Sequence, residues 1–260
     1  MWLKLLLTSE ARLAEGYRCV VGGTDEELLE TFGIAGGAVI AFAGTERPTY
    51  EAFEAWFSAS ATKLSNESID AFNEHLLAFE FNARRRDEWL VRFGLDGVRY
   101  TSAVLLNQLD DWAGAREQLH TIEPPVVPLI GSRCAGPIGL RHLPRFWWKL
   151  ALRAAGKLDV DADAGADRAF DGALLSALGL GRADLDVAFE ARIPDYIAFE
   201  EVIRERAGGA RLSPDLIETF NANVSAATIR RQEDADWLRF HEYFVSNAQG
   251  SGEKDLISSD

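Results

Sequence analysis

The sequence Trp2-Leu3-Lys4-Leu5 has a counterpart 145 residues later, Trp147-Trp148-Lys149-Leu150. Further matches follow in the same order at offsets of 146 to 148 residues. They pair residues 25–29 with 171–175, Phe32-Gly33-Ile34 with Leu178-Gly179-Leu180, Pro48 and Tyr50 with Pro194 and Tyr196, Leu64-Ser65 with Leu212-Ser213, Ile69 with Ile217, Phe72-Asn73 with Phe220-Asn221, and Trp89 with Trp237. A collinear series with so little insertion predicts an internal duplication.

Helical signals dominate both copies. Residues 26–31 and 172–177 have apolar side chains at helical spacing, and they are followed by Gly33 and Gly179, which suit left-handed C-caps. Further helices are predicted over residues 50–58 and 196–207, after N-caps at Ser65 and Ser213, and from about Pro144. Residues 126–130 are the part of the chain that looks extended, and their prolines argue against a central strand.

The predicted fold class is all-α, with two similar helical repeats packed as a pseudo-two-fold pair. Copy one, with a C-terminal extension, is expected over residues 1–122. Copy two, preceded by a basic Gly/Pro loop, is expected over residues 123–246. Residues 247–260 are predicted to be a disordered tail, because glycine, serine and charged side chains offer little to bury.

The run from Leu143-Pro144-Arg145 to Lys149, followed by Gly156-Lys157-Leu158 and Leu174-Leu175-x-x-Leu178-Gly179-Leu180, resembles a family of small bacterial helical domains of unknown function. That family carries a basic first helix and a Leu-Leu-x-x-Leu-Gly-Ile centre. This chain departs from the pattern at Trp148, where an acid would be expected before the lysine. The resemblance implies a helical fold present as two tandem copies, and it implies no activity.

Composition argues against several classes of protein. Of the 260 residues, 47% are hydrophobic and 26% are charged, which is enough apolar content to bury a core. Acidic residues outnumber basic residues 41 to 27, and a net charge of −14 repels nucleic-acid phosphates and anionic lipids. The two cysteines, Cys19 and Cys134, do not make a cysteine-rich zinc site. A cytoplasmic protein without nucleic-acid or membrane partners, cofactor or metal is therefore expected.

A basic segment, residues 131–158, stands out in this acidic chain. It reads GSRCAGPIGLRHLPRFWWKLALRAAGKL and contains no acid. Loop glycines and a helix N-terminus can direct backbone N–H groups at an anion. Arg133, Arg141, Arg145 and Lys149 are therefore candidate binding residues for a small carboxylate or phosphate. The alternative is a solvated basic face packed on acidic neighbours.

His142 and Cys134 lie in the same segment. Neighbouring cations lower the pKa of an imidazole, which would keep His142 neutral at pH 7 and able to act as a general base. A structural histidine at the helix start is the alternative. Cys134 beside Arg133 is a candidate nucleophile, but a lone cysteine is more often buried and inert.

Two acidic motifs carry less weight. Asp159-x-Asp161-x-Asp163 is similar to the start of a calcium loop, yet Ala164 and Phe170 replace the required glycine and glutamate, so a solvated acidic loop is favoured. Asp110 and Asp111 are adjacent on a helix and diverge, so they do not form a shared acid–base pair.

Aromatic and amide residues suggest further roles. Trp112 and Trp148 lack tryptophan partners in the other copy and are candidates to line an aromatic ligand pocket. Tryptophans that do have partners, such as Trp2 and Trp147, are expected in the core. Asn73 and Asn221 are expected to cap neighbouring helices rather than to act in catalysis.

These residues support two hypotheses about function. In the first, the chain is a cofactor-independent lyase or hydrolase of a small anionic, possibly aromatic substrate that binds between the copies, with His142 as general base and Arg133, Arg141 and Arg145 as anchors. In the second, it is a non-catalytic helical module that binds a ligand or a protein. A concave pocket lined by His142 and two of the arginines would favour the first.

Overall fold

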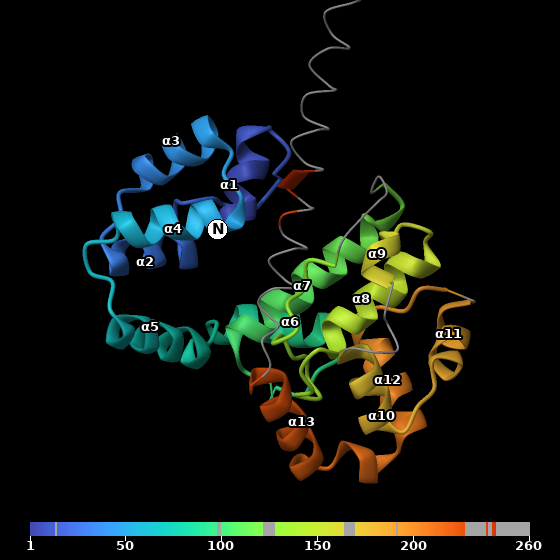
Figure 1. The fold of residues 1–260 in the computed structure, drawn as a ribbon. Coiled ribbons are helices and arrows are strands. Elements are labelled where there is room, and N and C mark those ends of the chain that lie inside the picture. Colours follow the sequence, from blue (N-terminus) through green and yellow to red (C-terminus); the bar gives the residue numbers. More distant parts are fainter. Residues whose placement is uncertain are drawn as a thin grey trace, which may run out of the picture. The chain divides into compact units, whose positions relative to one another are not determined.

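The computed structural model describes residues 1–13, 15–97, 100–121, 128–163, 170–190, 192–226, 238 and 241–242 (Figure 1). Every named element in these ranges is an α-helix or a short 3-10 helix, and the extended pairing consists of two isolated bridges, Glu80 with Ser102 and Ala135 with Arg141. The predicted all-α class is confirmed. Residues 126–127, part of the segment expected to be extended, lie outside the described ranges.

Contacts divide the chain into two units. Unit 1 comprises residues 1–78 with the described residues of 237–260, and unit 2 comprises residues 79–236. The predicted domain boundary at 122/123 and the predicted tail at 247–260 lie outside the described residues, so these limits stay predictions.

Unit 1 contains five named helices, which are α1 (Trp2–Ser9), α2 (Gly23–Phe32), α3 (Gly36–Glu46), α4 (Tyr50–Ser60) and α5 (Asn66–Ala78). Unit 2 contains α6 (Ala83–Phe93), α7 (Ala103–Glu117), η1 (Leu119–Thr121), α8 (Leu143–Ala154), α9 (Val160–Asp163), α10 (Phe170–Leu178), α11 (Arg182–Glu190), α12 (Tyr196–Ala207), η2 (Gly209–Leu212) and α13 (Pro214–Ala226).

Helix ends follow the local signals in the sequence. Gly33 and Gly179 have φ of 69° and 67°, a left-handed conformation that glycine adopts without steric strain, as predicted for C-caps. The side chains of Thr49 and Asp195 accept hydrogen bonds from the third residue after them and so cap α4 and α12. Ser65 caps the start of α5 by accepting from the Ser68 N–H.

Helix α8 forms the centre of the core of unit 2. Most of its residues are buried, and Trp147 is fully buried (0% exposed). The indole N–H of Trp147 donates to the Pro194 carbonyl at 3.1 Å, and its ring makes an edge contact with Tyr196, with centroids 5.5 Å apart. The chain before α12 is thereby fixed to α8.

Unit 1 contains the same set of contacts at the residues paired in the sequence. The Trp2 indole donates to the Pro48 carbonyl at 2.9 Å and makes an edge contact with Tyr50 at 5.7 Å. Lys4 forms an ion pair with Asp25, as Lys149 does with Asp171. Helix α1 packs on α3 and α2 on α5, while α8 packs on α11 and α10 on α13.

No single described helix is long and apolar enough to cross a membrane. Helices α2 and α3 taken together have the length and composition of one membrane span, but the chain bends by 105° between them.

Replacing Trp2 or Trp147 by Phe should lower the free energy of unfolding by a similar amount. Each change leaves a proline carbonyl without its indole donor, and an unsatisfied buried acceptor costs about 1–3 kcal/mol. Chemical denaturation of both variants measures the effect. Trp148→Phe is the control, since its indole N–H has no hydrogen-bond partner among the described residues. Unequal losses would contradict the equivalence of the two contacts.

Candidate functional site

The basic segment begins as a hairpin, residues 131–142, which leads into α8. Gly136-Pro137-Ile138-Gly139 forms its turn, closed by a hydrogen bond from the Gly139 N–H to the Gly136 carbonyl at 2.8 Å, and proline suits the second turn position. The two arms meet through the Ala135–Arg141 bridge and through the His142 N–H, which donates to the Cys134 carbonyl at 3.2 Å. Other polar groups of the hairpin backbone must find partners elsewhere.

Asn221 of α13 supplies two of these partners. Its Oδ1 accepts from the Arg141 N–H at 2.8 Å, and its Nδ2 donates to the Gly139 carbonyl at 2.8 Å. Asn221 therefore binds the backbone of the hairpin arm that leads into α8, whereas the sequence predicted that it caps a helix. Asn73, its partner in the sequence alignment, is exposed on α5.

His142 stands at the N-cap of α8 in a left-handed conformation, with φ of 68°, which is uncommon for a residue other than glycine. Its side chain is buried (3% exposed for the residue), and Nε2 lies 2.7 Å from Asp171 Oδ1. Lys149, about two turns into α8, forms an ion pair with the other oxygen of Asp171. His142 and Lys149 therefore meet at one buried carboxylate of α10.

The pKa values of this cluster follow from burial and charge. Burial lowers the pKa of His142, with smaller contributions from Arg145 and Lys149, while Asp171 opposes the shift. The direction is the one expected from the sequence, but burial rather than flanking cations is the main cause. Burial raises the pKa of Asp171, yet the hydrogen bond with His142 and the charge of Lys149 outweigh it and lower the pKa overall. The neutral imidazole of His142 is therefore hydrogen-bonded to the ion pair of Asp171 and Lys149.

The second ring nitrogen of His142 is unusual. Nδ1 is buried and has no hydrogen-bond partner among the described residues, whereas most buried polar atoms in proteins are paired. The Phe170 ring lies 5.6 Å from the imidazole, centroid to centroid. With Nε2 donating to Asp171, Nδ1 holds a free lone pair.

The candidate arginines bind different groups of the described residues. Arg145 is buried, and its Nη1 donates to the carbonyls of Pro128 at 2.6 Å and Ile130 at 3.0 Å. Arg141 and the exposed Arg133 both reach Ser225 of α13, Arg141 at the hydroxyl and Arg133 at the carbonyl, 3.4 Å away. All three side chains therefore bind groups of unit 2 itself.

Of the remaining candidates, the two tryptophans are packed in the interior. Trp112 of α7 is buried with its ring edge-on to Tyr196, centroids 4.7 Å apart, and Trp148 is buried beside Trp147. Cys134 is partly buried, and the Gln108 amide contacts its sulfur at 4.0 Å. Asp110 forms an ion pair with Arg92 of α6. Residues 164–167 of the acidic motif lie outside the described ranges.

Glu200 of α12 was not predicted and is the second buried acid against the hairpin. It is 2% exposed, and the Ile138 N–H donates to its two oxygens at 3.2 and 3.1 Å. A Cβ on Gly136 would lie 2.6 Å from Glu200 Oε1 and 2.5 Å from the Tyr196 hydroxyl, so glycine alone fits there without displacement. The turn directs a backbone N–H at an acidic side chain of the protein itself.

The pKa of Glu200 is raised to about 7. Burial is the main cause, and three groups offset it in part, namely the Tyr196 hydroxyl, the Ile138 N–H and the Arg204 guanidinium, which lies 4.0 Å away. The Tyr196 hydroxyl, one helical turn earlier, is buried beside this carboxyl group, and burial raises its pKa well above 10. This acid therefore titrates near neutral pH.

The sequence does contain a signal for both acids. Tyr196, Phe199, Glu200 and Ile203 are spaced i, i+3, i+4 and i+7, which is the apolar stripe of a helix with an acid in one position. Asp171, Leu174, Leu175 and Leu178 repeat the pattern. An acid on an apolar stripe requires buried partners, and these two find them in the hairpin and α8.

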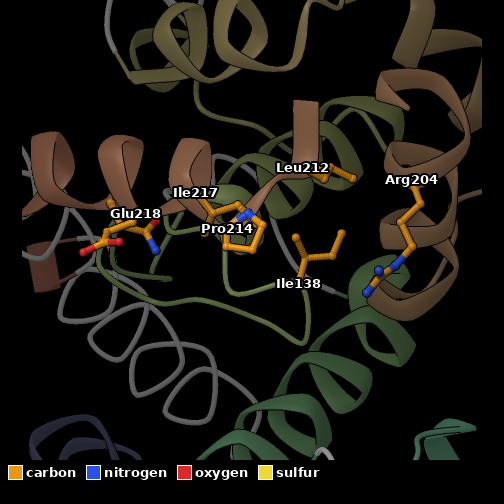
Figure 2. A pocket seen from close by; sticks show the side chains of 7 residues that line it. Ile138, Arg204, Leu212, Pro214, Ile217 and Glu218 are labelled. Atoms are coloured by element: carbon orange, nitrogen blue, oxygen red, sulfur yellow. The ribbon is translucent and has the colours of Figure 1, made fainter. Parts of the chain in front are cut away.

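A pocket of about 420 Å³ opens beside the turn of the hairpin. It is lined by Ile138, Arg204, Leu212, Pro214, Ile217, Glu218 and Asn221. Figure 2 shows the apolar side chains lying between Glu218 and Arg204. None of the predicted catalytic or substrate-binding residues is among those that line it, although Asn221, which was predicted to cap a helix, is. Within the described ranges, no three metal-ligating side chains cluster.

Arg145→Met should lower the free energy of unfolding by about 2–3 kcal/mol, because it leaves two carbonyls without a charged donor. Arg133→Met, at an exposed position of the same segment, is the matched control and should change stability by less than about 0.5 kcal/mol. Urea denaturation compares the two. An equal, small effect would indicate that Arg145 is not held as described.

The stability contributed by neutral His142 should fade as the pH falls below 6.5, the ordinary pKa. Below that pH the unfolded chain takes up a proton that the folded protein, with its lowered pKa, does not bind, so the native state loses stability. The gap in unfolding free energy between wild type and His142→Gln should therefore narrow between pH 7.5 and pH 5. A gap that widens would show that the folded imidazole is protonated more readily than the unfolded one.

No known protein family, curated protein or solved structure matches the chain. The resemblance to small bacterial helical domains stays a prediction.

Proposed function

We propose that the protein is a non-catalytic helical module that binds a small ligand in the pocket of unit 2. The observation that carries this proposal is that the basic segment, residues 131–158, binds groups of unit 2 itself. Arg145, His142 and the hairpin backbone are occupied by groups of unit 2, and they hold the hairpin whose Ile138 lines the pocket. Residues fixed in this way position a surface rather than react with a substrate.

The size and lining of the pocket indicate the class of ligand. Small-molecule sites usually measure about 300–1,000 Å³ and combine apolar walls with few polar groups. Ile138, Leu212 and Ile217 offer the apolar walls here, and Arg204 offers a cation at one end. A small molecule with an aromatic or aliphatic body, with or without an anionic group, fits this lining.

We also infer that helices α1–α5 of unit 1 and the helices from α8 to α13 of unit 2 descend from one duplicated helical segment. The paired Trp–Pro, Trp–Tyr and Lys–Asp contacts and the matching helix packings support this inference. A contact that recurs in both units serves the shared fold, which favours a scaffold role for Lys149 and Asp171. The pseudo-two-fold pairing of the repeats stays a prediction.

One observation favours the enzymatic alternative, a cofactor-independent lyase or hydrolase acting on a small anionic, possibly aromatic substrate. Asp171 orients the His142 ring through Nε2 and leaves Nδ1 unpaired, as in the carboxylate–imidazole pairs that position a general base. Hydrolysis of p-nitrophenyl acetate by wild type and His142→Gln tests it. A general base contributes about 10²–10⁴-fold in rate, so equal rates would favour the scaffold role.

Ile217→Asp should abolish ligand binding in the pocket. The change places a second negative charge beside Glu218 on the apolar wall, and an unpaired charge against an apolar ligand is strongly unfavourable. Thermal shift and ligand-observed NMR with indole, benzoate and inorganic phosphate measure binding. Val187→Asp, at an exposed apolar position of α11, is the matched control and should bind as wild type does. Binding of a probe equally by both variants would place the site elsewhere.

A further inference from the structure

The turn of the hairpin has two roles at once. Ile138 lines the pocket with its side chain, and its N–H is the backbone group that holds Glu200. Gly136, two residues earlier, packs so closely on Glu200 and Tyr196 that a Cβ would not fit. The position of this pocket wall therefore depends on the protonation state of one buried carboxyl group, that of Glu200.

Several groups that can carry charge surround this carboxyl. On α12, Arg204 lies 4.0 Å away and is shared with the exposed Glu201, and Tyr196 lies one turn earlier. The hairpin contributes the Cys134 thiol near Tyr196, and α13 contributes Glu218 on the far side of the pocket. Arg204 is the one cation at the Glu200 carboxyl among the described residues, and Glu201 competes for it, so ionised Glu200 is incompletely compensated.

We propose that Glu200 acts as a pH-dependent latch. Its hydrogen bond with the Ile138 N–H holds the hairpin closed, and ionisation of the carboxyl group favours opening of the hairpin, which moves the wall of the pocket. This inference rests on the proposed function for its biological meaning, because the hairpin is a wall of the proposed site. The latch itself is a property of unit 2 and can be measured without a ligand.

The sign follows from the two environments of the carboxyl group. With the hairpin closed, burial raises the pKa of Glu200 to about 7, whereas in water a glutamate has an ordinary value near 4.5. The closed form therefore binds the proton more tightly, and removal of the proton favours opening. Between pH 5 and pH 8 the equilibrium constant for opening should rise roughly 50- to 100-fold, as the two pKa values require.

Hydrogen exchange of the Ile138 amide, measured by NMR on the full chain, tests the proposal. After correction for the intrinsic exchange rate at each pH, protection of this amide should fall roughly 50- to 100-fold from pH 5 to pH 8. The amide of the fully buried Trp147 in α8 is the internal reference for global unfolding and should stay more protected than Ile138.

Two substitutions separate the latch from other titrations. Glu200→Gln keeps the shape and can still accept from the Ile138 N–H, but it does not ionise, so the pH dependence at Ile138 should disappear. Glu201→Gln is the matched control, since Glu201 is the exposed neighbour that shares Arg204, and it should retain the wild-type response.

Each contrary result has a distinct meaning. Protection at Ile138 that does not vary with pH in wild type overturns the latch, and so does a hairpin that exchanges only together with Trp147. A pH response that survives Glu200→Gln assigns the titration to another group and also overturns it. These results leave the proposed pocket untouched, whereas a working latch together with no binding of indole, benzoate or phosphate would overturn the proposed function alone.

Discussion

The structure of unit 2 depends on the need to satisfy the polar backbone groups of the hairpin. A hairpin with no neighbouring strand leaves N–H and C=O groups that a helix would pair internally. Asn221 and Glu200 pair three of them, and Asp171 holds the His142 side chain where the hairpin joins α8. Helices α10, α12 and α13 each supply one of these side chains, so their places around α8 are set by polar contacts as well as by apolar packing.

Two buried acids hold the hairpin, and their electrostatics differ. Asp171 faces Lys149 and His142, which lower its pKa despite burial. Glu200 accepts a hydrogen bond from the Ile138 N–H and faces the more distant Arg204, which also pairs with Glu201, and burial raises the pKa of Glu200 to about 7. The first acid is ionised whenever the protein is folded near neutral pH, which makes it a permanent anchor. The second changes charge over the range in which the stability gained from neutral His142 also changes, with the opposite sign.

Local chemistry made much of the fold predictable. The left-handed glycines Gly33 and Gly179, the cap at Ser65 and the proline before Tyr196 depend on neighbours within a few residues, and each marks a helix end where the structure has one. The core positions of Trp2 and Trp147 were also predictable, because a matched pair at helical spacing points to packing.

The candidate site was less predictable because its contacts are long-range. The positive charges of the basic segment suggested an exposed anion site, yet Arg145 binds carbonyls that precede the hairpin, and His142 binds an acid 29 residues away. Two adjacent glutamates, Glu200 and Glu201, are typical of a solvated helix face, and only the fold shows that the first is buried and the second exposed. Charge in a sequence does not reveal whether its partner is a ligand or another part of the chain.

The hairpin also has a consequence for how unit 2 folds. Its contacts with Glu200 and Asn221 join residues 62 to 82 positions apart, whereas the helices that carry these side chains form from contacts within a few residues. Closing such long loops lowers the conformational entropy of the chain before the contacts that compensate for it can form. Folding therefore slows as the sequence separation of contacts grows. Helix formation should therefore precede hairpin docking along the folding pathway, and the rate of folding should be governed by the arrival of this short segment rather than by the helices that make up most of the chain.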